Sequence, residues 1–186
     1  MSIRGTIFKE IQNRLMTAVP GIQWADKDRG QLEDPSNHVF PRPAVFFSFG
    51  LGQYENNGGN ILLGEKTLRV RTCVENYTSS HHGSVNIDQA LAFFDFNEAV
   101  QKALQGFSGT NFGNLSLIAD EDDLDHTNLI VTLLEFSFTL TDDSANSGKD
   151  LQLVDPDPKL VVNKTKVEDM PQEPPFTGVG LVIPVG

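Results

Sequence analysis

The chain has 186 residues, with 14 Lys+Arg against 25 Asp+Glu and a formal net charge of −11. This length suits one domain with or without a tail, and a hydrophobic fraction of 39% excludes a chain that is disordered throughout. Clustered cations that neutralise phosphates are scarce, which argues against duplex DNA as a direct binding partner. The single cysteine, Cys73, excludes an internal disulfide framework. Neither a membrane-length apolar run nor a secretory leader is recognisable, so we expect a cytosolic site of assembly.

The first predicted element is an amphipathic helix over residues 2–18. Apolar residues recur there every four positions, at Ile3, Ile7, Ile11 and Leu15. Ser2 is a suitable N-cap, because its hydroxyl can accept a hydrogen bond from an otherwise unpaired backbone N–H. Three segments follow: a short strand over 22–26, a polar loop over 28–37 and a central strand over 44–49 that ends at Gly50.

Residues 66–77 alternate with period two, which is typical of a strand with one buried face. Leu68, Val70, Thr72 and Val74 point one way, and Arg69, Arg71, Cys73 and Glu75 point the other. A second amphipathic helix is predicted over 87–104, with Asn86 as its cap. The chain then predicts a short strand over 115–119, an acidic connection over 120–125 and a last strand over 128–141 that forms a hairpin with it.

Strands that follow one another without intervening helices favour antiparallel pairing. We therefore predict an α+β fold, a mostly antiparallel sheet with two helices packed on one face. The domain is predicted over residues 1–141. Residues 142–186 are rich in proline and carry short apolar clusters, so we interpret them as an extended C-terminal arm that pairs with a sheet edge, with a flexible tail as the alternative.

The sequence offers no pattern that points to catalysis, a cofactor or a metal. The acidic run over 120–125 lacks the spacing and the turn glycine of a calcium loop. His81 and His82 are adjacent, so on an extended chain they point in opposite directions. Cys73 lies in the middle of a strand, where cysteine usually acts as a small hydrophobic residue. We predict no catalytic, cofactor-binding or metal-binding residues.

Two features point instead to contact with other proteins. The compact polar loop contains Gln31, Leu32 and Glu33 beside a strand, and Arg69 and Arg71 share the polar face of a strand, where arginine can reach acidic groups of a partner. Each feature is also compatible with ordinary protein surface. Taken together, these five residues are the predicted subunit or tube contacts.

The order of features resembles the small tail-terminator (tail-completion) proteins of long-tailed bacteriophages. The resemblance covers about residues 1–141, and residues 142–186 fall outside it. It is carried by the first helix, by Ile22-Gln-Trp-Ala-Asp26, by the Gly30–Glu33 loop, by Phe40-Pro-Arg-Pro-Ala-Val-Phe-Phe47 and by the later helix with Asp95-Phe-Asn-Glu-Ala-Val100.

The resemblance implies a non-enzymatic subunit that closes into a ring, commonly a hexamer. Such a ring caps the tail tube and joins it to the head connector, with the tube protein and the connector or neck protein as partners. DNA would only pass through the bore, and no membrane partner and no cofactor are implied. The implied location is the head-proximal end of the virion tail, after assembly in the host cytoplasm.

Two alternatives remain open from the sequence. Another head–tail junction protein, such as an adaptor or neck protein, or a minor tail or baseplate subunit would share the fold class and the acidity. A small hydrolase or metal-binding protein is the alternative from another class, and His81 and Cys73 are the residues that would have to serve it.

Overall fold

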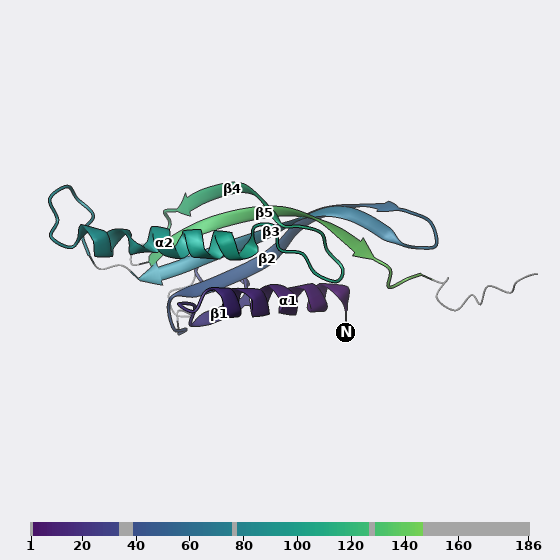
Figure 1. The fold of residues 1–186 in the computed structure, drawn as a ribbon, viewed down its shortest axis with the longest axis horizontal. Helices are drawn as coiled ribbons and strands as arrows, with labels where there is room; N and C mark the ends of the chain where they lie inside the picture. Colours follow the sequence, from purple (N-terminus) through teal and green to yellow (C-terminus); the bar gives the residue numbers. More distant parts are fainter. Residues whose placement is uncertain (1, 34–38, 76–77, 127–128, 147–186) are drawn as a thin grey trace, which may run out of the picture. The chain divides into compact units, whose positions relative to one another are not determined.

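A computed structural model describes residues 2–33, 39–75, 78–126 and 129–146. The predicted α+β fold is confirmed: within the described residues two helices accompany a five-stranded sheet of order β1-β2-β3-β5-β4 (Figure 1). The short strand β1 is parallel to β2, and the other neighbours are antiparallel. The elements are α1 (Ile3–Ala18), β1 (Trp24–Lys27), β2 (Ala44–Asn56), β3 (Leu62–Glu75), α2 (Ile87–Leu104), β4 (Ser116–Asp123) and β5 (Leu129–Asp142). The predicted arm lies outside the described residues from residue 147 on, and its boundary at 141/142 stays a prediction.

The two helix starts differ in how their first N–H groups are satisfied. Ser2 caps α1 as predicted, since its hydroxyl accepts a hydrogen bond from the backbone N–H of Gly5 at 3.3 Å. The expected side-chain cap of α2 is wrong, because the side chain of Asn86 makes no capping hydrogen bond. The backbone carbonyl of Asn86 accepts from Ala90 at 2.9 Å, and Asp88 places a negative charge in the first turn.

The strand β2 does not end at Gly50, as the sequence predicts, but continues to Asn56. It pairs with β3 along this whole length, with a bulge between Phe49 and Gly52. Glycine is required at Gly52 because an added Cβ would lie 2.8 Å from Cγ of Lys66, which crosses over it. Pairing with β3 thus carries β2 past Gly50, which marks a strand end only when the local sequence is considered alone. The ends of β2 and β3 form a hairpin that extends past both helices (Figure 1).

The acidic run is a strand and not the connection that was predicted. Asp120 to Asp123 belong to β4, which pairs with β5 and lies at the edge of the sheet. An edge strand tolerates such a run because Asp120, Glu121 and Asp122 remain exposed to water, and charge there discourages unwanted pairing. The predicted hairpin between β4 and β5 is confirmed.

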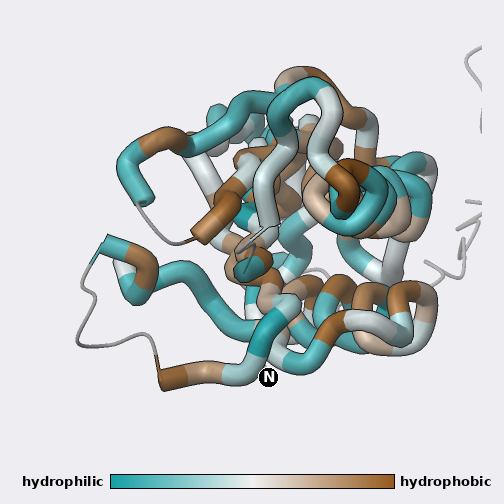
Figure 2. Tube along the Cα trace, turned by 90° about the vertical axis from the view of Figure 1, so that its left-hand side faces the viewer, coloured by the Kyte–Doolittle hydropathy of each residue, from teal (hydrophilic) through white to brown (hydrophobic). Residues whose placement is uncertain are grey.

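Both helices cover the same face of the sheet, as predicted. Figure 2 shows hydrophobic and hydrophilic stretches alternating along the helices, as in amphipathic helices. The buried members of this cluster include Ile7, Ile11, Leu15, Val100, Ala103 and Leu104 from the helices and Val45, Phe47, Leu68, Val70, Leu134, Phe136, Phe138 and Leu140 from the strands. None of the described helices is long and apolar enough to cross a membrane.

The opposite face carries a smaller buried cluster at one end of the sheet. Its members are Leu32, Phe40, Ala44, Phe46, Cys73, Leu129 and Val131. The prediction that β3 has a single buried face is therefore wrong at this end, where Thr72 and the oppositely directed Cys73 are both buried. The chain between β1 and β2 causes this, because it brings Leu32 and Phe40 over the strands. The sequence could not show that the loop returns to cover this face.

Candidate contact site around Arg71

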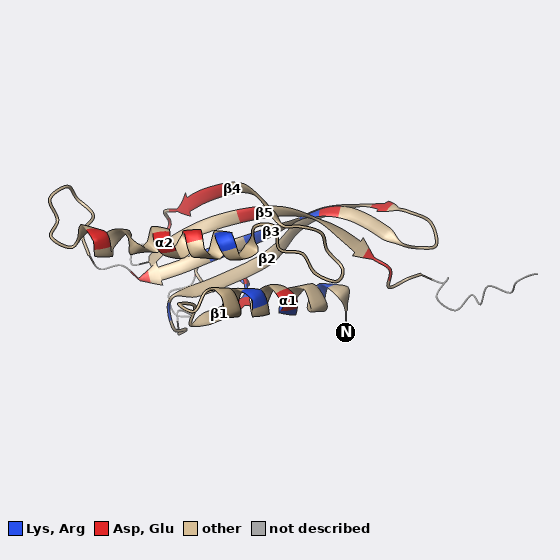
Figure 3. Ribbon diagram, in the orientation of Figure 1, with Lys and Arg blue, Asp and Glu red and all other residues tan. Residues whose placement is uncertain are grey.

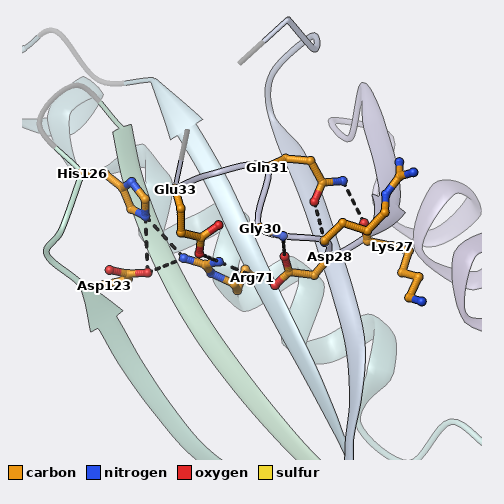
Figure 4. A network of polar contacts seen from close by, with 9 residues as sticks. Lys27, Asp28, Gly30, Gln31, Glu33, Arg71, Asp123 and His126 are labelled. Carbon is orange, nitrogen blue, oxygen red and sulfur yellow. Dashed lines mark hydrogen bonds and ion pairs between the residues drawn. The ribbon is translucent and has the colours of Figure 1, made fainter. Parts of the chain in front are cut away.

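Arg71 lies on β3, on the sheet face opposite the helices, and gathers carboxylates from two other parts of the chain (Figure 4). Its Nη1 donates to Glu33 Oε1 at 2.5 Å and lies 3.6 Å from Asp28 Oδ2. Its Nη2 donates to Asp123 Oδ2 at 2.6 Å. Asp28 and Glu33 belong to the loop after β1, and Asp123 ends β4. One guanidinium thus ties this loop to the far edge of the sheet, and we call these four residues the Arg71 network.

His126 closes the network beyond the end of β4. Its Nε2 lies 3.4 Å from both Arg71 Nη2 and Asp123 Oδ2, and its side chain is only 8% exposed. Figure 4 shows the imidazole on the Asp123 side of the guanidinium. The turn between β4 and β5 is therefore fixed to the same arginine as the loop after β1.

The loop after β1 is also held by its own polar groups. The Gln31 side chain accepts from the backbone N–H of Arg29 at 2.6 Å and donates to the carbonyl of Lys27 at 2.8 Å. Gly30 has a φ of 81°, in the left-handed region that favours glycine, and its N–H donates to Asp28 Oδ1 at 3.0 Å. These contacts give the loop one defined shape, which holds Asp28 and Glu33 toward Arg71.

Leu32 is buried, unlike its two polar neighbours in the loop. Its side chain is 1% exposed and packs in the second cluster with Phe46 and Cys73. Leu32 therefore anchors the loop to the sheet, and the exposed Glu33 beside it remains at the surface.

The charges of the network stabilise one another. Burial is the largest single influence and raises the pKa of Glu33 and of Asp123. The hydrogen bond from Arg71, a backbone hydrogen bond and the nearby positive charge of Arg71 together outweigh it, so both pKa values lie below their ordinary values. Burial opposes the charge of Arg71 as well, yet the hydrogen bonds to Glu33 and Asp123 raise its pKa. All three groups are therefore ionised at neutral pH.

Arg69 stands apart from the network although it lies on the same strand face. Its Nε donates to Glu135 Oε1 at 2.6 Å, from the strand beside it, and its side chain is 56% exposed. Both arginines line a recess of about 530 Å³ whose other charged lining residues are acidic: Asp28, Glu121, Asp122, Asp123 and Asp125. The structure thus brings Glu33 and Arg71 into contact and leaves Arg69 on the open side of the recess. Gln31 lies in the same loop as Glu33, but its side chain bonds to the backbone of Lys27 and Arg29.

Sequence reasoning missed Asp28, Asp123 and His126 as partners of Arg71. Asp28 lies in the predicted polar loop, and Asp123 lies in the segment predicted as an acidic connection. An arginine in a strand usually pairs with carboxylates, and the acidic run that follows the second helix supplies candidates. These two facts are the sequence evidence that could have indicated the partners. Which acids meet Arg71 depends on the strand order, which the sequence does not reveal.

His81 and Cys73 are the residues that a small hydrolase or metal-binding protein would use, and they form no site within the described part of the chain. Cys73 is fully buried, and burial raises its pKa to about 11, so it is a neutral thiol at physiological pH. His81 lies in an exposed loop, where its Nδ1 is 2.6 Å from the hydroxyl of Ser79. The described residues contain no group of three or more His, Cys, Asp and Glu side chains arranged to hold a metal ion.

Comparison with known proteins gives no family assignment. No family model matches the chain, and no curated protein matches it either. Among solved structures, a chain of the virion of a native gene transfer agent particle matches with 12% sequence identity and a TM-score of 0.41. The match covers 71% of this chain and 92% of that one. Similarity at this level assigns no function.

Proposed function

We propose that this protein is a non-enzymatic structural subunit of a virion. Several copies, in a hexamer by resemblance, form a ring that caps the tail tube and joins it to the head connector. The observation that carries the proposal is the Arg71 network, which combines predicted contact residues into one fixed surface. The resemblance of residues 1–141 to tail-terminator proteins supplies the place in the particle and the partners.

The network suits docking better than chemistry. A general base has to be free to accept a proton from the substrate, and a nucleophile has to be free to attack it. Here the carboxylates of Glu33 and Asp123 accept hydrogen bonds from Arg71, and Cys73, the single cysteine, is buried. A surface whose charged groups are already paired keeps its shape when a partner approaches, which lowers the entropic cost of binding.

The acidity of the surface agrees with a ring through which DNA passes. The charged residues that line the recess beside Arg71 are mainly acidic, and β4 carries four acidic residues in succession (Figure 3). Carboxylates repel phosphates, so an acidic bore lets DNA pass without holding it. Surfaces of this kind are poor sites for binding DNA but are suitable for partners that bring Lys or Arg.

Labelled particles test the location directly. We expect a gold-conjugated antibody against an epitope tag on this chain to mark the head-proximal end of the tail in electron micrographs. A label on the connector side favours an adaptor or neck protein, and a label at the distal end favours a baseplate subunit. Particles without label overturn a virion role.

Arg69 offers a substitution that tests contact without breaking the network. Because Arg69→Glu leaves Arg71 and its carboxylates in place, we expect a folded protein that joins fewer tails to heads. Lys102→Glu is the matched control, since it makes the same charge change on an exposed part of α2 that lies away from the recess. Equal tail joining by both variants would count against the recess as a contact surface.

A further inference from the structure

One pocket of this acidic chain is cationic. A pocket of about 360 Å³ lies between the first turns of α1 and the edge of β2. Its charged lining residues, among those that the structure describes, are all cations: Arg4, Lys27 and Lys66. Its apolar floor is formed by Phe8, Phe47 and Phe49. Three cations around aromatic rings make a site for carboxylate groups that arrive with some apolar surface.

The cations of this pocket have little compensation within the described chain. Lys66 is 7% exposed, and its Nζ donates to the backbone carbonyl of Gly50 at 3.1 Å. Neither Lys27 nor Lys66 forms an ion pair with a described carboxylate. Arg4 acts at a distance on Asp142, whose pKa is lowered mainly by hydrogen bonds from Ser144 and also by the charge of Arg4. An arriving carboxylate would therefore compensate a nearly buried ammonium group.

The pocket lies beside an unpaired edge of the sheet. The strand β1 pairs with β2 only as far as Phe47, while β2 continues to Asn56. On that side, the described residues supply no partner strand for β2 from Ser48 onward. Backbone N–H and C=O groups along such an edge can pair with a strand from another molecule.

The opposite edge of the same sheet has the complementary chemistry. The edge strand β4 is 8 residues long and exposes Asp120 and Glu121, next to the exposed Ile118. Asp122 accepts a hydrogen bond from Thr132, whose hydroxyl also accepts one from Asn97 of α2, so Asp122 lies on the helix face. Asp120 is two residues earlier in the strand and shares that face. Arg4 and Phe8 belong to α1, which covers the same face.

We propose that β4 of one copy adds to the free edge of β2 of the next copy, with Asp120 directed toward the cationic pocket. This inference rests on the ring assembly proposed above and names the two surfaces that meet in it. The contact is head-to-tail, because each copy offers β4 at one edge and the pocket at the other, and head-to-tail contacts generate closed rings. Figure 3 shows the acidic strand β4 at one edge of the sheet and the basic residues of α1 near the other edge.

Charge exchange tests the pairing on the full chain. The first variant combines Arg4→Glu with Lys27→Glu, and the second combines Asp120→Lys with Glu121→Lys. All four residues are exposed, so folding should persist, which circular dichroism checks. We expect the wild type to sediment as an oligomer and each variant alone to lose that oligomer, as measured by sedimentation velocity. A mixture of the two variants, and a chain that carries all four substitutions, should regain it, because acid then faces base at every contact.

Two further variants separate the pocket from general charge effects. Lys27→Glu alone leaves the interaction of Arg4 with Asp142 in place and should still weaken assembly. Lys9→Glu makes the same charge change on the exposed side of α1, outside the pocket, and should assemble like the wild type. Assembly of either double variant like the wild type, or failure of the mixture to recover, overturns the pairing while the ring proposal stands. A wild type that stays monomeric overturns both.

Discussion

The two faces of the sheet are stabilised by different means. On one face α1 and α2 bury a large apolar cluster in which Phe47 and Phe136 are almost fully enclosed. On the other, a small cluster around Phe46 supports one end, and the Arg71 network holds the loop after β1 against β3 and β4. Apolar burial contributes at any pH, whereas the network depends on ionised carboxylates. The helix face therefore sets the global stability, and the opposite face sets the shape of the surface that we propose for docking.

The largest expected effect comes from the helix face. Phe136→Ala removes a fully buried ring and leaves a cavity, so we expect the free energy of unfolding to fall by about 3–5 kcal/mol. Urea denaturation followed by circular dichroism measures the change. A loss below about 1 kcal/mol would mean that the cluster collapses to fill the space, against the well-packed core described here.

A smaller loss is expected from the network. Arg71→Met keeps much of the side-chain volume but leaves the carboxylates of Glu33 and Asp123 without their donor. We expect a loss of roughly 2–3 kcal/mol, since the side chain of Arg71 is 13% exposed and Asp123, 23% exposed, loses its donor in a partly buried place. Hydrogen exchange should show faster opening of the loop after β1 than of α1. Uniform loosening of both would contradict the separation of the two faces.

Acid should weaken the network face selectively. The pKa values of Glu33 and Asp123 are lowered in the folded state from ordinary values of 4.5 and 3.8. Their contribution is therefore complete at neutral pH, begins to be lost as the pH falls below those values, and is gone below the folded pKa values. We expect the stability difference between wild type and Arg71→Met to shrink between pH 7 and pH 3. A difference that stays constant would show that these carboxylates are not the partners that matter.

The smallest loss of stability is expected at Arg69, two residues before Arg71. Arg69→Met removes an ion pair with Glu135 in which the arginine is 56% exposed, so we expect a loss of about 0–1 kcal/mol. Because Arg69 and Arg71 share a strand and a face, this variant is the matched control for burial of the guanidinium. A loss as large as that of Arg71→Met would mean that burial does not distinguish the two sites.

The helices and the core face of β3 could be predicted from the sequence because their signals are local. The spacing of Ile7, Ile11 and Leu15 alone predicts the buried side of α1, and Leu68 and Val70 alone predict the face of β3 that receives it. The cap at Ser2 also depends only on neighbouring residues. In each case the residues that determine the local structure are close together in the sequence, within two helical turns or a few strand positions.

The limits of strands and the partners of charges depend on residues far apart in the chain. The glycines of β2 indicate a turn locally, yet β3 pairs with them and Lys66 fills the space above Gly52. Asp120 to Asp123 have low strand propensity, yet pairing with β5 extends β4 through them. The five predicted contact residues could be chosen from loop composition and strand face, but that choice also included the buried Leu32 and the separate Arg69. Asp123 and His126 meet Arg71 only through the strand order.

The mass of the purified full-length chain in solution, measured by sedimentation over a range of concentrations, tests the central claim most directly. A protein that acts by contacting copies of itself should form a closed oligomer of defined size, a hexamer if the resemblance holds, and electron micrographs should show it as a ring. A single stable monomer at every concentration would contradict the account.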